Sequence, residues 1–414
     1  MYPSQGIDAR PLHVAICGAG ISGFAAAIAL RNQGHIVELY EKASFSKEFG
    51  AAIGVPPNGT RVLNHLGYNR HRARAVDYYG VTIFRFHSCA RHQEWTTVHR
   101  VDMHNELRYL AMKPDGKGTP AKLFLSSAVE SCDAKNGVLR LASGKTRQFD
   151  LIIGADGIDS KIRSSVVGKV VDAPIAPKPA AIFRWCMPVE VLEGRPDLDW
   201  IMTEGIQGSR VTSSAEGHFL VSYLCRDKKV INSLAFHIDK RDQTKFPKNV
   251  ASSKEEMLEE FKQYAPKYIK WIQLAEGVRH WQMRTLPVLD TWVNGHTCLI
   301  GDAAHAMFPT LGHGAAMGLE DACVLAGLLP AGTAPSQVNE RLRAFEHLRK
   351  DRDEWIAHQS EIQALDPEHW GIFERSHEQQ DKMMLYDAPK VAADYYNKHF
   401  AHKQAPAFLE SAHL

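Results

Sequence analysis

The chain has 414 residues, a length that suggests two or three domains, and its 44% hydrophobic and 23% charged content is ordinary for a globular protein. The 49 basic and 47 acidic residues leave a formal charge of +2, so the balance indicates neither a nucleic-acid partner nor an anionic membrane. The seven cysteines include no CxxC pair and are odd in number, which argues against a zinc site or a disulfide framework and favours reduced thiols in the cytoplasm.

The N-terminal part predicts a β-turn-α-β unit. The segment before His13 has no apolar core of the kind that marks a signal peptide, so we expect a cytoplasmic protein without a membrane anchor. A β-branched run over His13–Cys17 is followed by a glycine turn, an alanine-rich helix over Phe24–Asn32 and a second strand over Ile36–Glu41. This succession is typical of a dinucleotide-binding fold.

The glycine turn carries the first chemical signal. Gly18, Gly20 and Gly23 spell GxGxxG, in which the first glycine permits the tight turn, the second lets a pyrophosphate approach the backbone, and the third lets the helix pack closely. Glu41 follows Gly23 by eighteen residues (41 − 23), the separation expected of an acid that binds the adenosine ribose. This block predicts a dinucleotide site but does not choose between FAD and NAD.

The next elements lead into a different kind of sheet. Asn105–Leu110 is able to start a helix, although no clear apolar period follows it. A hairpin over Gly137–Leu141 and Thr146–Phe149 precedes a buried strand over Asp150–Ala155.

From about Lys178 to Arg284 the composition shifts to strand-like runs broken by Gly, Pro and Asn, such as Ile182–Val189 and His218–Leu224, and we expect Val81–Phe86 to add a strand to them. A buried strand returns over Thr297–Gly301, and most of the chain is helical from Gly314 onward.

Two further blocks place an acid in a turn directly after a buried strand. One contains Asp156-Gly157 and, shortly after it, Arg163; the other reads Gly301-Asp302-Ala-Ala-His305. With the glycine turn they resemble, in the right order, the three signatures of the class A flavoprotein aromatic hydroxylases, the family of p-hydroxybenzoate and salicylate hydroxylases. The segment Val98–Met103 resembles the family's strand that carries a flavin-contacting arginine, and the pattern Phe345-Glu346…Arg349…Arg352 is also similar. The likeness spans roughly residues 12–360 and assigns nothing to the last fifty or so.

The resemblance implies bound FAD, with NADPH or NADH and O2 as co-substrates. Asp302 would bind the ribityl chain, Glu41 the adenosine ribose, and Arg100 the ribityl or pyrophosphate region. Asp156 and Arg163 would serve both FAD and the nicotinamide, while the helix from Gly314 would point its N–H groups at the flavin O2. The expected cofactor-binding positions are Gly18, Gly20, Gly23, Glu41, Arg100, Val129, Asp156, Gly157, Arg163, Gly301, Asp302, Pro309, Gly312, Gly314 and Ala315, and no metal is expected.

The expected fold is therefore α/β, with a Rossmann-like FAD-binding domain, an inserted and mainly antiparallel substrate sheet, and a helical C-terminal region. We place the FAD-binding domain at 11–75, 100–177 and 285–330, the substrate domain at 76–99 and 178–284, and the helical region at 331–414.

The inserted sheet is expected to form the floor of an apolar pocket beneath the flavin, where water is excluded. Tyr223 resembles the family's substrate-contacting tyrosine, and Arg184 resembles a strand arginine that pairs with a carboxylate. A strand tyrosine is, however, usually a half-buried packing residue, and a strand arginine usually points to solvent. His305 fits a catalytic or a turn-stabilising role. Many members carry an asparagine where this chain has Ala316, and the departure favours the salicylate and 6-hydroxynicotinate hydroxylase branch.

The expected activity is hydroxylation of a small phenolic or aromatic acid, with decarboxylation where a carboxylate occupies the attacked carbon, by a monomer or homodimer. A flavin epoxidase or a Baeyer–Villiger-type oxygenase on the same scaffold is the alternative. A non-catalytic dinucleotide-binding protein is a remote alternative.

Overall fold

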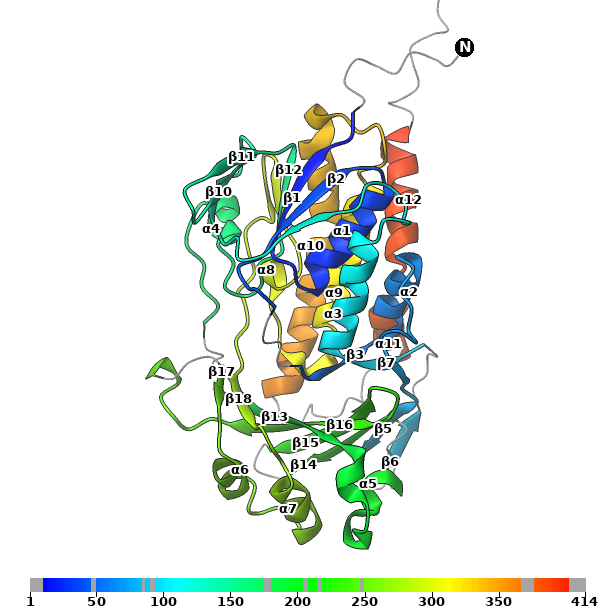
Figure 1. Ribbon diagram of the computed structural model, residues 1–414, viewed down its shortest axis with the longest axis vertical. Helices are drawn as coiled ribbons and strands as arrows, with labels where there is room; N and C mark the ends of the chain where they lie inside the picture. The colour runs from blue at the N-terminus through cyan, green and yellow to red at the C-terminus, as the bar shows by residue number, and fades with distance from the viewer. Residues whose placement is uncertain are drawn as a thin grey trace, which may run out of the picture.

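Two large sheets of different kinds organise the chain, one above the other along the long axis of the molecule (Figure 1). The computed structural model describes residues 10–45, 50–83, 86–89, 94–174, 180–203, 208–213, 218–245, 249–365 and 376–401. The upper sheet is mainly parallel and the lower one mainly antiparallel, which confirms the predicted α/β fold with an additional antiparallel sheet.

The upper sheet is built around the first strand of the chain, whose parallel neighbours are the next strand of the chain on one side and a strand more than a hundred residues later on the other. Its four inner strands are almost wholly buried and apolar, as is typical of parallel sheets covered on both faces. The order is β19 (Val293–Asn294), β20 (Thr297–Leu299), β12 (Leu151–Gly154), β1 (His13–Cys17), β2 (Ile36–Tyr40) and β8 (Lys122–Phe124).

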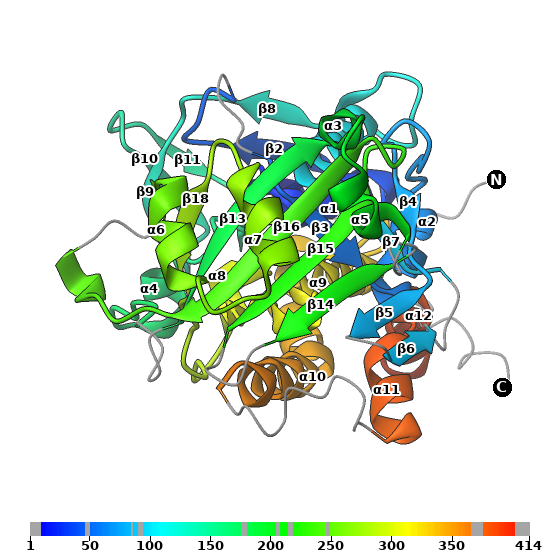
Figure 2. The ribbon, with the colours of Figure 1, turned by 90° about the horizontal axis from the view of Figure 1, so that it is seen from below.

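The lower sheet has eight strands and carries helices on its outer face. The order is β17 (Asn249–Ala251), β18 (Arg279–Gln282), β13 (Ala180–Pro188), β16 (Val230–Ile238), β15 (Phe219–Cys225), β14 (Ser209–Ser213), β5 (Gly80–Ile83) and β6 (Phe86–Cys89). The strand expected over Val81–Phe86 thus appears as two strands, with residues 84 and 85 outside the described ones. Seen from below, the sheet is crossed by α5 (Trp200–Thr203), α6 (Lys254–Glu260) and α7 (Pro266–Gln273) (Figure 2).

Two three-stranded sheets complete the β structure. One joins β11 (Thr146–Gln148), β10 (Val138–Leu141) and β9 (Val129–Asp133), which confirms the predicted hairpin. The other joins β3 (Ala52–Val55), β7 (Thr96–His99) and β4 (Val76–Asp77) and lies between the two large sheets (Figure 1).

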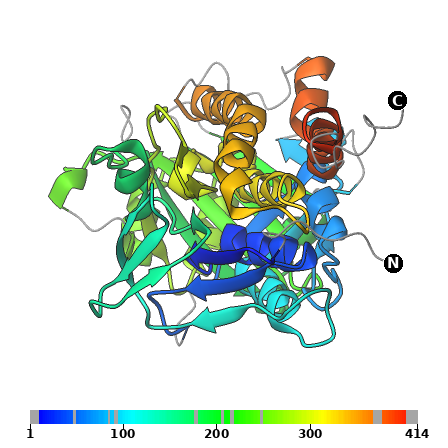
Figure 3. The ribbon, with the colours of Figure 1, turned by 90° about the horizontal axis from the view of Figure 1, so that it is seen from above.

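Helices pack together on one side of the upper sheet. Seen from above, the dark-blue α1 (Ile21–Asn32) lies between the blue strands and the yellow and orange helices α9 (Gly314–Gly327) and α10 (Val338–Leu365) (Figure 3). The remaining helices are α2 (Pro57–His65), α3 (Arg100–Met112), α4 (Ile162–Val167), α8 (Asp302–His305), α11 (His377–Met384) and α12 (Ala388–His399). We call residues 376–401, which contain α11 and α12, the C-terminal arm. Within the described part of the chain, no helix combines the length and apolar character needed to span a bilayer.

A second element also differs from the prediction. Arg100, expected on a strand, is the first residue of α3, and the strand β7 ends one residue earlier at His99. The helix buries Met103, Leu107 and Leu110 at helical spacing, but polar residues are buried between them and conceal this period in the sequence.

Candidate functional site

The carboxyl ends of β1, β2, β12 and β20 meet at one edge of the upper sheet. The chain runs from β1 to β2 on one side and later adds β12 on the other side of β1, so strand order reverses between β1 and β12, which is the usual ligand crevice of such sheets. All three acidic or glycine-rich turns predicted from the sequence follow these strands, and the structure therefore brings them together.

Each of the three glycines in the glycine turn has a different structural role. Gly18 has φ +100°, and a Cβ there would lie 2.3 Å from the carbonyl oxygen of Ala155, so only glycine fits. A Cβ on Gly23 would lie 2.0 Å from the carbonyl oxygen of Gly18, which explains the close packing of α1. A Cβ on Gly20 would meet no atom of the described residues within 4 Å, which leaves the open approach that a pyrophosphate requires. These contacts fit a bound dinucleotide.

Ala19, inside this turn, is held from two sides. Its backbone N–H donates to Glu41 Oε2 at 2.9 Å, and its carbonyl oxygen accepts a 2.7 Å hydrogen bond from His104 Nε2 of α3. Glu41 thus lies at the turn, as expected of a ribose-binding acid. His104 was not anticipated from the sequence, because only the fold brings α3 against the glycine turn.

In the DG turn, the acid and the arginine are both engaged by protein. Asp156 accepts hydrogen bonds from Ser160 Oγ at 2.6 Å and from the backbone N–H of Lys161 at 2.7 Å, so it caps α4. Arg163 is 2% exposed, and its guanidinium donates to the carbonyl oxygens of Ile158 and Ala303. Its side chain therefore joins the DG and GD turns from the buried side.

The GD turn presents its acid to the crevice. Gly301 has φ +59°, and a Cβ there would lie 2.5 Å from Ser22 Oγ of α1. Asp302 is exposed, and among the described residues none donates a hydrogen bond to its carboxylate. A free carboxylate beside the glycine turn is what a ribityl hydroxyl would bind.

The remaining expected cofactor positions surround these turns. Pro309 is exposed at the start of a short 3-10 turn, Gly312 has φ +67°, and Gly314 and Ala315 are half-buried at the N-terminus of α9. Arg100 is exposed at the N-terminus of α3. Val129 is half-buried at the start of β9, in the small three-stranded sheet.

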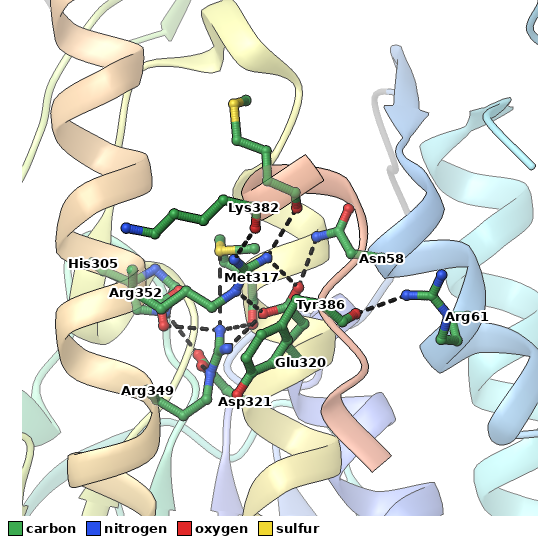
Figure 4. Close-up of polar contacts among 12 residues, drawn as sticks. Asn58, Arg61, His305, Met317, Glu320, Asp321, Arg349, Arg352, Lys382 and Tyr386 are labelled. Atoms are coloured by element: carbon green, nitrogen blue, oxygen red, sulfur yellow. Dashed lines mark hydrogen bonds and ion pairs between the residues drawn. The ribbon is translucent and has the colours of Figure 1, made fainter. Parts of the chain in front are cut away.

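His305, also predicted as a site residue, belongs to a set of six buried ionisable side chains that we call the buried ion cluster (Figure 4). Its members come from α8, α9 and α10: His305, Glu320, Asp321, Arg349, Arg352 and Asp353. His305 Nε2 donates to Asp321 Oδ2 at 2.7 Å. Burial by itself would lower the pKa of His305, but the adjacent Asp353 and Asp321 carboxylates outweigh it and raise this pKa to about 9.

Three members of the cluster, His305, Asp321 and Asp353, bring possible metal-ligand atoms within 4.8 Å of one another. Arg349, however, donates to Asp321 Oδ1 at 2.8 Å and lies 2.8 Å from Asp353 Oδ2. The Arg349 guanidinium already pairs with both carboxylates, so their arrangement fits an ion-pair network better than a cation site.

The inner face of the lower sheet, opposite α5–α7, is arranged in rows across the strands. The first row, Ile182, Phe236 and Phe219, packs toward Phe308 of the segment after α8. The middle row contains Arg184, Leu234 and Val221. The third row contains Cys186, Asn232 and Tyr223.

The third row is covered by β3 through the backbone of Ala52. Tyr223 is 8% exposed and its hydroxyl donates to the Ala52 carbonyl oxygen at 2.8 Å, while the Ala52 N–H donates to Asn232 Oδ1 at 3.0 Å. The middle row stays half-exposed, so Leu234 and Val221 form an apolar floor between β3 and Phe308.

Arg184 is the cation at this floor. Its Nη2 makes one long contact of 3.5 Å with the Ala52 carbonyl oxygen, and its guanidinium lies 5.7 Å from the ring of Trp281. Its Nε is buried, and no described residue accepts a hydrogen bond from it. Burial lowers the pKa of Arg184, because the nearby groups compensate only in part for the water that its charge has lost.

Aromatic side chains form one wall beside the floor. Tyr78 stacks on Trp95 with ring centroids 4.9 Å apart, and Tyr78 Oη lies 2.7 Å from Ser209 Oγ of β14. Trp95 also meets the ring of His313, the residue before α9, edge to face at 6.4 Å. The wall therefore connects the N-terminus of α9 to the lower sheet.

Comparison with known proteins agrees with this arrangement. A family model described as an FAD binding domain matches residues 11–360. The chain is 41% identical over 398 residues to hispidin-3-hydroxylase of Neonothopanus nambi, covering 91% of this chain and 94% of that protein. It is 30% identical over 373 residues to salicylate hydroxylase of Pseudomonas putida, covering 82% of each. The structure of a salicylate hydroxylase substrate complex has the same fold, with a TM-score of 0.75 at 22% identity over 92% of this chain and 97% of that one.

Proposed function

Since this chain belongs to the class A flavoprotein aromatic hydroxylases and is an FAD-dependent monooxygenase that uses NAD(P)H and O2, we propose that it hydroxylates a planar ring bearing an ionisable hydroxyl group. Relatives named for hispidin and for salicylate support a phenolic or related aromatic substrate. The proposal includes the domain boundaries given above, a cytoplasmic location, and a monomer or homodimer.

The position of Arg184 is the observation that carries this proposal. A guanidinium beside an apolar floor, with a buried Nε that lacks an acceptor among the described residues, fits an anionic oxygen on an otherwise apolar ring. An ionised ring hydroxyl makes the ring electron-rich, and electron-rich rings are attacked most readily by an electrophilic oxygen. Arg184 would hold this oxygen and thereby fix which ring carbon faces the cofactor.

FAD, once reduced by NAD(P)H, supplies the activated oxygen. We propose that Asp302, Glu41 and Arg100 bind its ribityl, ribose and pyrophosphate regions, and that the N-terminus of α9 stabilises negative charge on the flavin ring. Leu234, Val221 and the Trp95 wall would exclude water from the reacting atoms.

Tyr223 receives a different role from the one expected from the sequence. Its hydroxyl is occupied by the Ala52 carbonyl oxygen, and burial raises its pKa, so it would act as a positioning residue for β3. The Arg163 contacts likewise support a positioning role, in which it joins the DG and GD turns.

The test is coupled turnover with a panel of hispidin, salicylate and ring compounds without a hydroxyl group. We expect product formation matched to NAD(P)H oxidation only for hydroxylated rings. Arg184→Met should raise KM about tenfold or more, since a charge-assisted hydrogen bond contributes roughly 1.5–3 kcal/mol.

Arg279→Met is the matched control, because Arg279 is the cross-strand partner of Arg184 but binds Asn249 through its Nε. Equal KM values for wild-type protein and Arg184→Met, or hydroxylation of rings that lack a hydroxyl group, would contradict the proposed substrate class.

A further inference from the structure

The C-terminal arm lies beyond residues 11–360, the part of the chain that the family model covers. It is nevertheless packed closely against the FAD-binding half. A Cβ on Gly327 of α9 would lie 2.6 Å from Cβ of Ala392 in α12, so these two helices are in direct contact. Arg341 of α10 stacks on Phe400 at 3.5 Å, just after α12 ends.

The other end of the arm is held by Arg352 of α10. Arg352 Nη1 donates to the carbonyl oxygen of Lys382 at 2.7 Å, and Nη2 donates to that of Met383 at 3.0 Å (Figure 4). These carbonyls belong to the last turn of α11, where helical carbonyl oxygens lack intrahelical partners. The guanidinium also lies 4.1 Å from the ring of Tyr386. Arg352 therefore caps α11 and anchors the arm.

The same arginine belongs to the buried ion cluster. Arg352 Nε donates to Glu320 Oε2 at 2.8 Å, and Arg349 Nη1 donates to the same oxygen at 2.5 Å. Arg349 lies 5.2 Å from the Tyr386 ring, so the arm covers both guanidinium groups.

Beyond these arginines, the cluster reaches the GD turn. Asp321 Oδ2 accepts the backbone N–H of Gly301 at 2.9 Å, and Gly301 directly precedes Asp302. Asn58 Nδ2 donates to Glu320 Oε1 at 2.7 Å, and Asn58 belongs to the helix that follows β3. Each step from Tyr386 to Gly301 is thus a contact between groups that are largely or wholly excluded from water.

The C-terminal arm contacts the buried ion cluster through uncharged groups. Three carboxyl groups face two guanidinium groups and His305, so the formal charges balance when His305 is protonated and all three carboxyl groups are ionised. The arm contributes no side-chain charge to the pairs around Glu320, but it supplies two carbonyl oxygens and a ring face. Without the arm, Arg352 would turn toward water and Glu320 would lose its bidentate partner.

We propose that the C-terminal arm is part of the cofactor site: its docking on Arg352 and Arg349 holds the GD turn in its FAD-binding conformation, and FAD in turn favours docking of the arm. Tyr386 is then a positioning residue, which acts on the GD turn through the buried ion cluster. Because binding free energies are reciprocal, the arm and FAD must stabilise each other by the same factor.

Hydrogen exchange tests the reciprocal effect in the full-length protein. We expect the amides of residues 376–401 to exchange several-fold more slowly in the FAD-saturated protein than in the flavin-stripped protein. Unchanged exchange throughout the arm would overturn the proposal.

Tyr386→Leu tests the other direction. It should raise the dissociation constant for FAD about tenfold, a factor typical of coupling between two binding sites. It should also change the visible absorption of the bound flavin. Tyr386→Phe, which keeps the ring, should restore both. Lys390→Gln is the matched control in α12, because Lys390 forms an exposed ion pair with Asp394 of the same helix.

If Tyr386→Leu does not fold, Arg61→Gln removes a milder contact, the 2.9 Å hydrogen bond from Arg61 Nη1 to the Tyr386 carbonyl oxygen. A dissociation constant for FAD that stays at the wild-type value in a folded variant with faster exchange in the arm would contradict the coupling. None of these measurements depends on the substrate, so they stand apart from the proposed ring hydroxylation.

Discussion

Asp302 and Arg163 show how two residues of neighbouring turns take opposite positions. Asp302 is exposed at the crevice, while the Arg163 side chain is buried behind it with its donors on backbone carbonyl oxygens. The acid is free for a ligand because its turn is fixed by others. The two residues should therefore respond differently to mutation.

Asp302→Ala should abolish most flavin binding without unfolding the protein. The carboxylate has no hydrogen-bond donor among the described residues, so the free energy of unfolding of the flavin-free protein should change by less than about 0.5 kcal/mol. Flavin absorbance per chain after purification measures the effect. A variant that retains a full complement of FAD would show that Asp302 does not bind the cofactor.

Because of His305, the free energy of unfolding should decrease at alkaline pH. Its pKa, raised to about 9 in the folded protein against about 6.5 in an unfolded chain, means that folding stabilises the protonated form. This contribution is complete below about pH 6.5 and is lost as the pH rises through about 9. Urea unfolding at pH 7 and pH 9.5 should show a smaller pH-dependent loss in His305→Gln than in the wild type, and equal losses would exclude this histidine as the cause.

At the scale of elements, three segments meet where α1, α9 and the GD turn are in contact. A Cβ on Gly318 of α9 would lie 2.1 Å from Ser22 Oγ and 3.3 Å from the Gly301 Cα. The close packing of α1, α9 and the GD turn thus depends on the lack of a side chain at Gly318. A Cβ added there must displace the Ser22 hydroxyl and press on α1 and the GD turn.

Gly318→Ala should therefore destabilise the protein by roughly 1–3 kcal/mol, the usual cost of overpacking, and reduce flavin content. Gly314→Ala is the comparison for the flavin-free protein, because its Cβ would meet only Met307 Cγ at 4.0 Å. That change should be neutral or slightly stabilising, since alanine is the better helix former. Thermal unfolding measures the stability of both variants. Equal melting temperatures for Gly318→Ala and Gly314→Ala would rule out the tight contact at Gly318.

Most elements were predictable because their signals are local. The strands at His13–Cys17 and Leu151–Gly154 are continuous apolar runs, and the hairpin near Gly144 has a turn sequence. The start of α3 at Arg100 was missed because its buried face includes His104 and Glu106, whose partners lie in distant turns. A polar residue that is buried for a tertiary reason interrupts the apolar period from which a helix is predicted.

At the scale of the whole molecule, Asp102 of α3 connects the two halves. Its carboxylate, 6% exposed, accepts hydrogen bonds from Arg74 at 2.6 Å and from Arg226 at 2.9 Å, and Arg226 lies in the turn between β15 and β16. Burial would raise the pKa of Asp102, but these two arginines outweigh it and lower the pKa. The lower sheet is thereby fixed relative to the helix that begins with Arg100.

Asp102→Asn should increase wasteful NAD(P)H oxidation. Loosening the lower sheet relative to α3 would admit water above the apolar floor, so more hydrogen peroxide and less hydroxylated product should form while flavin content stays unchanged. Peroxide yield per NAD(P)H measures the effect. Asp290→Asn, which breaks a surface pair with Lys169, is the control, and equal peroxide yields would contradict a connecting role for Asp102.

The inserted sheet was predictable from the change in composition, and the side on which Arg184 and Tyr223 lie follows from strand alternation once the register is known. The buried ion cluster and the arm were beyond reach. The contacts of Arg352 with Lys382 and Met383 are made by backbone atoms, which leave no trace in residue types. The similar pattern at Arg349 and Arg352 gave only a hint of their importance.

The order of strands in the upper sheet also bears on how the chain folds during synthesis. The strand β1 pairs with β12, which pairs with β20, so residues near 15, 152 and 298 must all be present before the sheet is complete. Most strands of the lower sheet come from the continuous segment 180–282, whose contacts are nearer in sequence and form sooner. On the ribosome, the lower sheet is therefore expected to form while β12 still lacks β20 as a partner. Exposed strand edges at that stage favour aggregation, so the yield of folded enzyme should depend on chaperones.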